Sequence, residues 1–392
     1  MTDQSMPNSS VLNQAAAILK VVQTGVPADQ ALRENLTRSR HRSAPAERRA
    51  ISRAVFTCFR WWRWLEPKDS LQKQLAAALE LQEQFDRDPK SIKPAALAAR
   101  AVPGWLKTEM DEVPSAWLQQ LQREPALWIR ARQDWETKVA QSLGHCEPAT
   151  HAAIRIPHSA LRYSGSADLY RTPGFQSGDF EIQDLASQLV GHACAPKPGE
   201  TWWDTCAGEG GKTLHLADLM QNQGLIWASD RSARRLAKLK ERTARARVFN
   251  YRAAAWDGGP RLPTKTKFDG ILIDAPCSGV GTWQRNPHAR WTTQPKDVRE
   301  LAAVQARLLA HAAPALKPGG RLIYAVCTLT RAETTAVADT FTAEHSEFEP
   351  APVFAVAGLD EPGPGSPTPA TTTLWPQELN ANGMFIAAWR KR

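Results

Sequence analysis

The sequence predicts an α/β protein whose C-terminal part forms a doubly wound, mainly parallel sheet, preceded by a small mixed α/β segment and an all-helical region. Three observations support this. Strands and helices alternate strictly after residue 198. Pro and Gly punctuate short segments between residues 101 and 190. Apolar residues recur at helical spacing over residues 10–100. We therefore expect three domains, at residues 1–100, 101–190 and 191–392.

The helical region is predicted from three segments with apolar residues every three or four positions. The first ends in a glycine, which is a common helix stop, and the second carries arginines on its other faces. These segments are SVLNQAAAILKVVQTG (10–25), AERRAISRAVFTCFRWWRWL (46–65) and SLQKQLAAALELQEQF (70–85).

The C-terminal sheet is predicted from apolar runs of strand length, separated by helical segments. A basic helix over residues 231–246 follows the second run, and a helix over residues 299–316 precedes the fifth. The expected strands lie in ETWWDTC (200–206), GLIWASD (224–230), RVFNYRAA (247–254), FDGILIDAP (268–276), RLIYAVCT (321–328) and GMFIAAWRK (383–391).

The composition is ordinary for a folded soluble protein. Of 392 residues, 42% are hydrophobic and 23% are charged. No apolar run is long enough for a membrane helix, and the start MTDQSMPNSS lacks the basic and apolar regions of a signal peptide, so we expect a cytoplasmic protein. The six cysteines form no CxxC pair, and we expect neither a disulfide framework nor a bound metal.

Positive charge is concentrated in two clusters. The net charge is +9, and basic residues greatly outnumber acidic ones between Arg33 and Arg63 and between Arg231 and Arg252. Each cluster alone could be a solvated helix face. Two such clusters flanking a candidate active site favour contacts with the phosphates of a nucleic acid.

A glycine-rich segment, DTCAGEGGKT (204–213), follows the first predicted strand and begins a helix. Such a turn exposes backbone N–H groups and lets a ligand approach closely. Asp230, at the end of the next strand, suits a carboxylate that binds ribose hydroxyls. Together they predict a nucleoside-containing cofactor, with NAD and S-adenosylmethionine both open. The segment is neither GxGxxG nor a P-loop, which disfavours a dinucleotide or triphosphate. Asp257, after the third strand, could reach the adenine or be inert.

Two thiols and a carboxylate lie at the ends of the fourth and fifth predicted strands. Asp274 and Cys277 occur in FDGILIDAPCSGVGTWQRNP, and Cys327 occurs in GGRLIYAVCTLTRAE. Ligands of open α/β sheets bind at this edge. Either cysteine alone is best interpreted as a small buried residue. Two at adjacent strand ends, one beside Asp-Ala-Pro, make that interpretation poor.

These segments carry a resemblance to a known family. In chain order QDLASQLV, DTCAGEGGKT, LIDAPCSGVGTWQRNPHARW, PGGRLIYAVCTLTRAE and GMFIAAWR resemble the signature segments of the RNA cytosine-5 methyltransferases, over roughly residues 103–392. The N-terminal region resembles, more weakly, the NusB-like RNA-binding domain of the bacterial ribosomal RNA members. The resemblance implies a Rossmann-like methyltransferase domain, a small α/β RNA-binding subdomain, S-adenosylmethionine as cofactor, a monomer and an RNA substrate. Ribosomal RNA is favoured over transfer RNA through the N-terminal match alone.

The resemblance also implies roles for the reacting groups. Cys327 would add to carbon 6 of the cytosine, Cys277 would assist release, and Asp274 would hold the base. DNA cytosine-5 enzymes place their nucleophile in a Pro-Cys at the position of Cys277, so the opposite assignment stays open. Spacing does not separate the two, and the family match alone favours Cys327.

The remaining site residues are carried over from the same match. Glu209 stands where the family usually has Pro, and AVCT replaces the commoner STCS, but neither change removes a reacting group. Residues expected to line the cofactor are Cys206, Ala207, Gly208, Glu209, Gly210, Gly211, Lys212, Asp230, Arg235, Asp257 and Asp274. Residues expected to contact RNA are Arg285, Asn286, Pro287 and Arg290.

Three other functions use the same features less completely. A dehydrogenase would leave both cysteines and the basic clusters unexplained. A non-catalytic RNA-binding factor would not need intact Asp274, Cys277 and Cys327. A DNA methyltransferase is the nearest chemical alternative. In each methyltransferase case the target base must be unstacked, because a thiol cannot reach carbon 6 inside a duplex.

Overall fold

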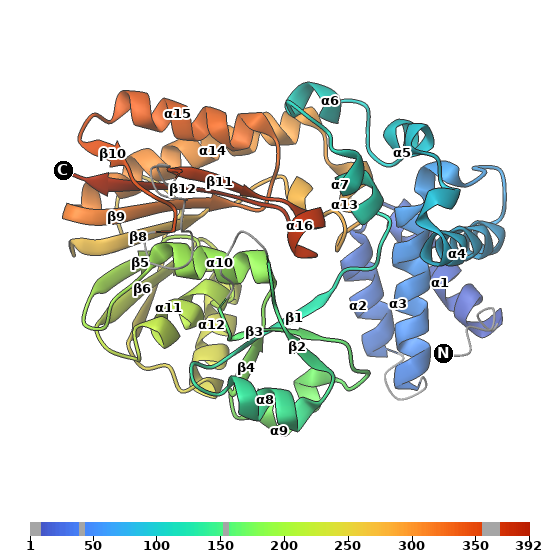
Figure 1. Cartoon of the computed structure of the whole chain (residues 1–392), viewed down its shortest axis with the longest axis horizontal. Helices are drawn as coiled ribbons and strands as arrows, with labels where there is room; N and C mark the ends of the chain where they lie inside the picture. Colours follow the sequence, from blue (N-terminus) through green and yellow to red (C-terminus); the bar gives the residue numbers. More distant parts are fainter. Residues whose placement is uncertain (1–8, 39–43, 152–156, 355–368) are drawn as a thin grey trace. The chain divides into compact units, whose positions relative to one another are not determined.

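The chain forms two compact units, and each is described by itself. The computed structural model describes residues 9–38, 44–151, 157–354 and 369–392 (Figure 1). The helical unit comprises residues 1–124 together with 282–293, and the sheet unit comprises residues 125–281 together with 294–392. The helical unit therefore contains a short segment from the C-terminal half of the chain, which the expected division into three consecutive domains did not include.

The helical unit is built on amphipathic helices, as the spacing of apolar residues predicts. Helix α3 starts at a proline in its first turn and buries Ile51 and Val55, while α4 is capped by Ser70, whose hydroxyl accepts from the N–H of Lys73. The helices are α1 (Ser9–Gln23), α2 (Ala28–Arg38), α3 (Pro45–Arg60), α4 (Leu71–Arg87), α5 (Pro94–Arg100), α6 (Leu106–Glu109), α7 (Ser115–Gln120) and α13 (Ala289–Thr292).

A small antiparallel sheet opens the sheet unit. Its strands β1 (Leu127–Ala131), β2 (Cys146–Pro148), β3 (Ala160–Tyr163) and β4 (Phe180–Ile182) lie in the order β2-β3-β1-β4. Helices α8 (Glu136–Leu143) and α9 (Pro173–Gln176) belong to the same segment. The predicted mixed α/β character of this region is confirmed.

The main sheet is mostly parallel, which confirms the predicted doubly wound α/β fold. Its order is β10-β12-β9-β8-β5-β6-β7, and β11 pairs with β12. The five strands from β9 to β7 in this order run parallel, and β12 is antiparallel to β9. The strands are β5 (Thr201–Asp204), β6 (Leu225–Asp230), β7 (Tyr251–Ala255), β8 (Phe268–Asp274), β9 (Leu316–Val326), β10 (Phe348–Pro350), β11 (Thr371–Leu374) and β12 (Met384–Lys391).

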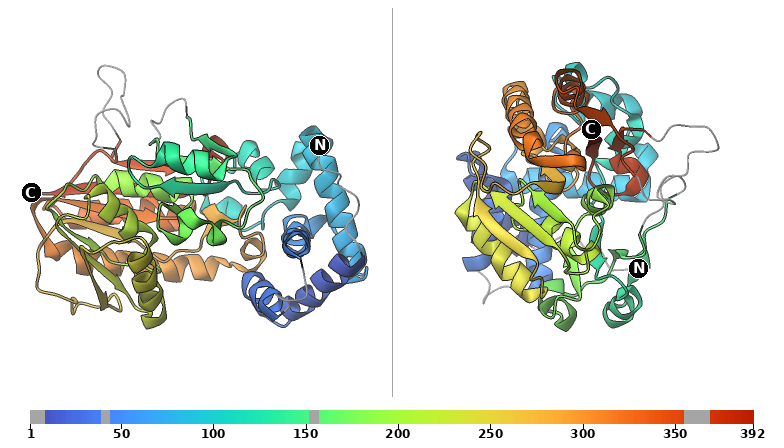
Figure 2. Two further views of the ribbon diagram at one scale, coloured as in Figure 1. Left: turned by 90° about the horizontal axis from the view of Figure 1, so that it is seen from below. Right: turned by 90° about the vertical axis from the view of Figure 1, so that its left-hand side faces the viewer.

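Helices cover both faces of this sheet (Figures 1 and 2). Alternate side chains of β8 serve opposite faces: Leu272 joins the core formed with α10 and α11, whereas Ile271 and Ile273 join the core formed with α14 and α15. The helices are α10 (Leu185–Cys194), α11 (Gly211–Leu219), α12 (Ala233–Arg245), α14 (Pro295–Ala312), α15 (Thr335–Glu344) and α16 (Pro376–Leu379). No helix of the described residues combines the length and apolar character needed to cross a membrane.

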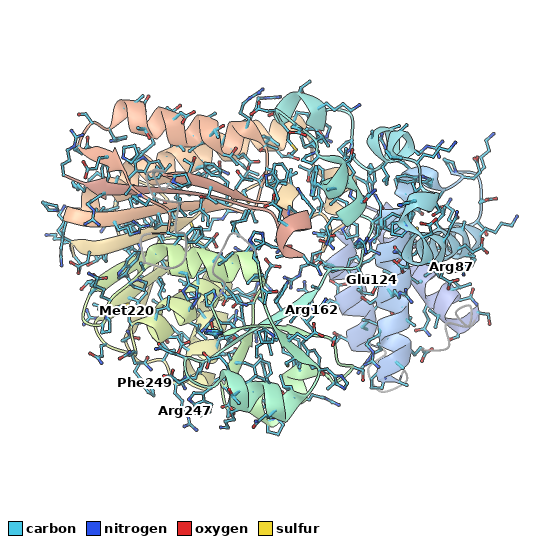
Figure 3. The ribbon with its side chains drawn as sticks, in the orientation of Figure 1. Arg87, Glu124, Arg162, Met220, Arg247 and Phe249 are labelled. Carbon is cyan, nitrogen blue, oxygen red and sulfur yellow. The ribbon has the colours of Figure 1, made fainter. Side chains whose placement is uncertain are left out.

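Two strand boundaries differ from the expected ones. Strand β7 begins at Tyr251, because Arg247 has a left-handed φ of +53° and the chain turns there, leaving Phe249 78% exposed (Figure 3). Strand β9 begins at Leu316, before the Pro-Gly-Gly that was expected to separate it from the preceding helix. A turn therefore delays the start of β7, whereas the turn signal before the expected start of β9 does not interrupt that strand.

Candidate active site

The candidate site lies in the sheet unit, at the carboxyl ends of β5, β6, β8 and β9. The glycine-rich turn after β5 has one packed side and one open side. A Cβ at Gly210 (φ +87°) would lie 2.8 Å from Leu239 Cγ, whereas a Cβ at Gly208 (φ +55°) or Gly211 would meet nothing within 4 Å. Ligand atoms could therefore approach the backbone closely on the open side, at the start of α11.

Asp230 lies directly beside this turn. Its carboxylate is buried and accepts the N–H of Gly208 at 3.0 Å and of Ser232 at 2.7 Å. The Arg235 guanidinium lies 3.9 Å away with its side chain 57% exposed. The turn and the acidic residue expected to bind a cofactor ribose are thus brought together, and they fit a nucleoside with polar hydroxyls.

The other residues expected at the cofactor differ in exposure. Burial raises the pKa of the Cys206 thiol to about 12, so this cysteine is a neutral lining group. Ala207 is buried and Glu209 is exposed. Asp257 is also exposed, and its carboxylate accepts the N–H of Gly259 at 2.9 Å, which holds its own loop.

Lys212 and Asp274 form a close ion pair between α11 and the end of β8. The Lys212 Nζ donates to Asp274 Oδ2 at 2.6 Å, and both side chains are largely buried. Burial alone would lower the pKa of Lys212, but attraction to Asp274 outweighs it and raises that pKa. The ammonium group therefore stays charged beside the thiols.

The two thiols are in contact, with 3.3 Å between Cys277 Sγ and Cys327 Sγ. All six cysteines of the chain are free. The hydrogen bond from Cys277, helped by nearby Lys212, lowers the pKa of Cys327 despite burial. The same hydrogen bond, together with burial, raises the pKa of Cys277 well above its usual range. With Cys277 as the donor of this hydrogen bond, Cys327 is the sulfur that ionises more readily.

Two groups that were not singled out from the sequence also belong to this edge. Asp204 ends β5, is fully buried and accepts the hydroxyl of Thr213 at 2.6 Å. Burial raises the pKa of Asp204 to about 7. Glu333, six residues after Cys327, is fully buried beneath both thiol-bearing loops. The sequence indicated these two residues only by placing them at or shortly after the ends of predicted strands. It did not show that their side chains are buried.

The four residues expected to contact RNA lie in the helical unit and are not equally accessible. Arg285 is exposed, Asn286 is half-buried, and Pro287 is buried. Arg290 is fully buried, so the prediction that it contacts a phosphate is wrong. Its guanidinium donates to carbonyl oxygens at or near the ends of three helices, which lack partners within their own helices. These acceptors are Arg60 (3.5 Å), Ala101 (3.0 Å) and Leu121 (3.0 Å), together with Trp283 (3.4 Å).

Comparison with known proteins gives a consistent result. Residues 192–390 match the family described as 16S rRNA methyltransferase RsmB/F. The ribosomal RNA small subunit methyltransferase B of Erwinia tasmaniensis is 30% identical over 315 residues, covering 78% of this chain and 68% of that protein. The probable ribosomal RNA small subunit methyltransferase B of Synechocystis is 36% identical over 260 residues, covering 65% of this chain and 57% of that protein. The matches thus span about half to two thirds of these relatives' lengths.

Solved structures share the fold. The protein PH0851 superposes with a TM-score of 0.78 at 22% identity, covering 99% of both chains. NSun6 from Pyrococcus horikoshii, solved with SFG, has a TM-score of 0.60 at 20% identity and covers 73% of this chain and 96% of its own. From the sequence match to the family and to its curated relatives, the chain belongs to the 16S rRNA methyltransferase RsmB/F family.

Proposed function

We propose that this protein transfers a methyl group from S-adenosylmethionine to carbon 5 of a cytosine in RNA, with ribosomal RNA of the small subunit as the favoured substrate. The observation that carries the proposal is the contact between Cys277 and Cys327, 3.3 Å apart at Sγ, beside the Lys212–Asp274 ion pair. A nucleophile and a second acid–base group in contact suit a reaction in which a covalent bond to the base forms and later breaks.

The cofactor is held by the open side of the glycine-rich turn and by Asp230. The turn contributes Gly208 and Gly211, where added side chains would meet open space, and the N-terminus of α11. S-adenosylmethionine supplies the methyl group when it is bound there. Arg235 and Asp257 remain candidates for outer contacts, since both are exposed.

The residues of this chain perform the covalent steps. The Cys327 thiolate adds to carbon 6, forming an S–C bond and moving electron density toward carbon 5. Asp274, which already accepts from Lys212 through Oδ2, accepts with its other oxygen from the amino group of the base, and from N3 as N3 becomes protonated. After carbon 5 is methylated, the proton on carbon 5 passes to water with the assistance of Cys277, the electron pair re-forms the double bond between carbons 5 and 6, and the S–C bond breaks to release Cys327 as a thiolate.

The RNA substrate is supported by three features. The names of the relatives refer to ribosomal RNA of the small subunit. The net charge is +9, and Arg285 is exposed next to the segment that follows Cys277. The target cytosine is an unpaired or locally opened nucleotide, because both sulfurs must reach one ring. The protein acts in the cytoplasm, as a monomer.

The test is trapping of the covalent adduct. With RNA and S-adenosylmethionine, Cys277→Ala should accumulate a protein–RNA complex that survives denaturing electrophoresis, because addition proceeds but release is blocked. Cys327→Ala should form no such complex. Cys146→Ala is the matched control, since Cys146 lies in β2 of the small sheet, and it should behave as the unaltered protein.

Other outcomes would redirect the proposal. An adduct with Cys327→Ala and none with Cys277→Ala would exchange the two roles. Methylation of a DNA pool in preference to RNA would replace the substrate. Mapping of 5-methylcytosine in ribosomal and transfer RNA, from cells with and without the protein, would separate these two RNA classes.

A further inference from the structure

Glu333 is a buried carboxylate with an unusually complete set of donors. It is fully buried at the end of a short helical turn, Arg331–Glu333. Oε1 accepts the N–H of Ser278 at 2.8 Å and the side-chain amide of Gln305 at 3.0 Å. Oε2 accepts the hydroxyls of Ser278, of Thr328 at 3.2 Å and of Thr330 at 2.8 Å. Five donors thus converge on one carboxylate.

Four of these donors come from the two loops that carry the thiols, and the fifth is the Gln305 amide on α14. Ser278 directly follows Cys277, and Thr328 directly follows Cys327. The hydroxyl oxygens of Ser278 and Thr328 also lie 2.9 Å apart. Backbone bonds join the same loops on either side, from the N–H of Ala275 to the carbonyl of Ala325 and from the N–H of Gly281 to the carbonyl of Cys327. The carboxylate lies where the two loops meet.

A second group of contacts connects this cluster to the sheet and to α14. The Gln305 amide donates to the carbonyl of Pro276 at 2.9 Å as well as to Glu333. The Tyr324 hydroxyl is close to both the backbone carbonyl of Glu333, at 2.6 Å, and Gln305 Oε1, at 3.0 Å. Gln305 and Tyr324 are fully buried. The Gln305 side chain therefore contacts both Pro276, just before Cys277, and Glu333 at the centre of the cluster, and Tyr324 contacts Gln305 and Glu333.

Burial makes these contacts energetically coupled. A carboxylate removed from water costs several kcal/mol unless its oxygens are saturated by donors. Here saturation needs both loops at once, so moving either loop away would leave a buried charge partly unpaired. The two loops are consequently expected to move as one body.

We propose that Glu333 is a positioning residue that keeps Cys277 and Cys327 in contact by holding their loops together. Its hydrogen bonds go to the residues that follow the two cysteines and to Gln305, and its charge also contributes to the raised pKa of Cys277. The inference rests on the proposed function for its catalytic meaning, but the sulfur–sulfur geometry it predicts can be measured without RNA or cofactor.

Two variants test it with little change of volume. In Glu333→Gln the amide oxygen can remain on the side of the Ser278 N–H and the Gln305 amide, so its amino group faces three hydroxyls that must reorient. Thr330→Val removes one hydroxyl donor and keeps the shape. Glu300→Gln on α14 is the matched control, because Glu300 is exposed and pairs only loosely with Lys296, at 3.6 Å.

The first measurement is the rate at which diamide joins Cys277 and Cys327, followed by mass spectrometry of peptides. Diamide takes up two electrons and two protons as the two thiols become a disulfide. The rate should fall about tenfold in Glu333→Gln and less in Thr330→Val, because the contact is populated less often. It should be unchanged in Glu300→Gln.

The second measurement is turnover on RNA together with affinity for S-adenosylhomocysteine by calorimetry. We expect kcat to fall about tenfold or more in Glu333→Gln while KM and the affinity for S-adenosylhomocysteine change less than about twofold. A residue that only stabilises the fold would instead lower the melting temperature without altering the diamide rate of the folded protein.

The outcomes separate the two proposals. Unchanged diamide coupling and kcat in both Glu333→Gln and Thr330→Val would overturn the positioning role. If Glu333→Gln does not fold, Thr330→Val alone decides. An unaltered protein that couples its thiols rapidly, yet methylates no RNA, would contradict the proposed function while leaving the positioning role intact.

Discussion

Two fully buried charges, one in each unit, contrast in how they are satisfied. Arg290 of the helical unit donates to four backbone carbonyls. Glu333 of the sheet unit accepts from five donors, four of them on side chains. Arg290 was expected to contact RNA, whereas Glu333 was not singled out.

The difference teaches what each charge is for. Three of the four acceptors of Arg290 are carbonyls at or near the ends of α3, α5 and α7, and backbone carbonyls are not altered by substituting the side chains of those residues. The donors of Glu333 flank two reactive thiols. Arg290 supplies hydrogen bonds to backbone carbonyls of the helical unit, and Glu333 is proposed to hold together the two loops of the candidate site. The role of each buried charged residue therefore follows from the groups that it contacts and not from its charge alone.

The largest effect is expected from Arg290→Met. Burial lowers the pKa of Arg290 to about 9, so the guanidinium is charged at neutral pH and its removal leaves four carbonyls short of a donor. The free energy of unfolding should fall by about 3–5 kcal/mol, measured by urea denaturation. Arg285→Ala, on the exposed neighbour, should change it by less than about 0.5 kcal/mol. Equal effects would contradict the structural role of Arg290.

Asp204→Asn should show the next largest effect, and one that depends on pH. Because burial raises the folded-state pKa of Asp204 to about 7, the folded chain holds a proton that the unfolded chain releases near pH ~4. The protonated Asp204 carboxyl therefore contributes its full amount to the free energy of unfolding below about pH 4, and this contribution is lost as the pH rises toward 7. The variant lacks this loss, so its stability relative to the unaltered protein should increase by roughly 3 kcal/mol between about pH 4.5 and 7.5. A pH-independent difference in melting would contradict this.

Cys277→Ala should shift the reactivity of Cys327 without a large effect on stability. The Cys277 thiol donates to Cys327 and lowers its pKa, so removing the donor should raise that pKa. The pH at which Cys327 becomes alkylated by iodoacetamide, followed by mass spectrometry, should move upward. Cys146→Ala should leave the profile where it was, and an unshifted profile in Cys277→Ala would show that the contact does not tune the nucleophile.

Gly208→Ala should have the smallest effect on stability and a selective effect on binding. Its φ of +55° strains any other residue by about 1 kcal/mol, and the added methyl group would enter the open side of the turn. Affinity for S-adenosylhomocysteine should fall at least about tenfold. Gly199→Ala has a comparable φ of +90° and open space, so it should cost similar stability and leave binding unchanged.

Most of the sheet could be predicted from the sequence, because alternating apolar runs and helical segments report directly on a doubly wound fold. The beginning of β7 could not, since it depends on a left-handed turn at Arg247, a conformation that arginine rarely adopts. The beginning of β9 was misplaced because Pro-Gly-Gly, a usual turn signal, forms an irregularity within the strand, where Gly319 has a φ of +74° and the pairing with β8 shifts register.

The grouping of the candidate site was also predictable, since strand ends of a parallel sheet share one edge. The structure brings together Gly208 and Asp230, Lys212 and Asp274, and the two thiols. Which charges are buried was not predictable. Arg290 and Glu333 lie in polar segments, and only tertiary packing determines which backbone or side-chain groups surround them.

The helical unit includes residues 282–293, which the ribosome makes long after residue 124. Arg290 and Trp283 lie fully buried within that unit, so an N-terminal fragment ending near residue 124 would lack part of its own interior. During synthesis the helical unit therefore completes its packing only after residues 282–293 have left the ribosome. For the same reason, residues 1–124 fused alone to another enzyme would lack residues 282–293 and would not form the complete helical unit.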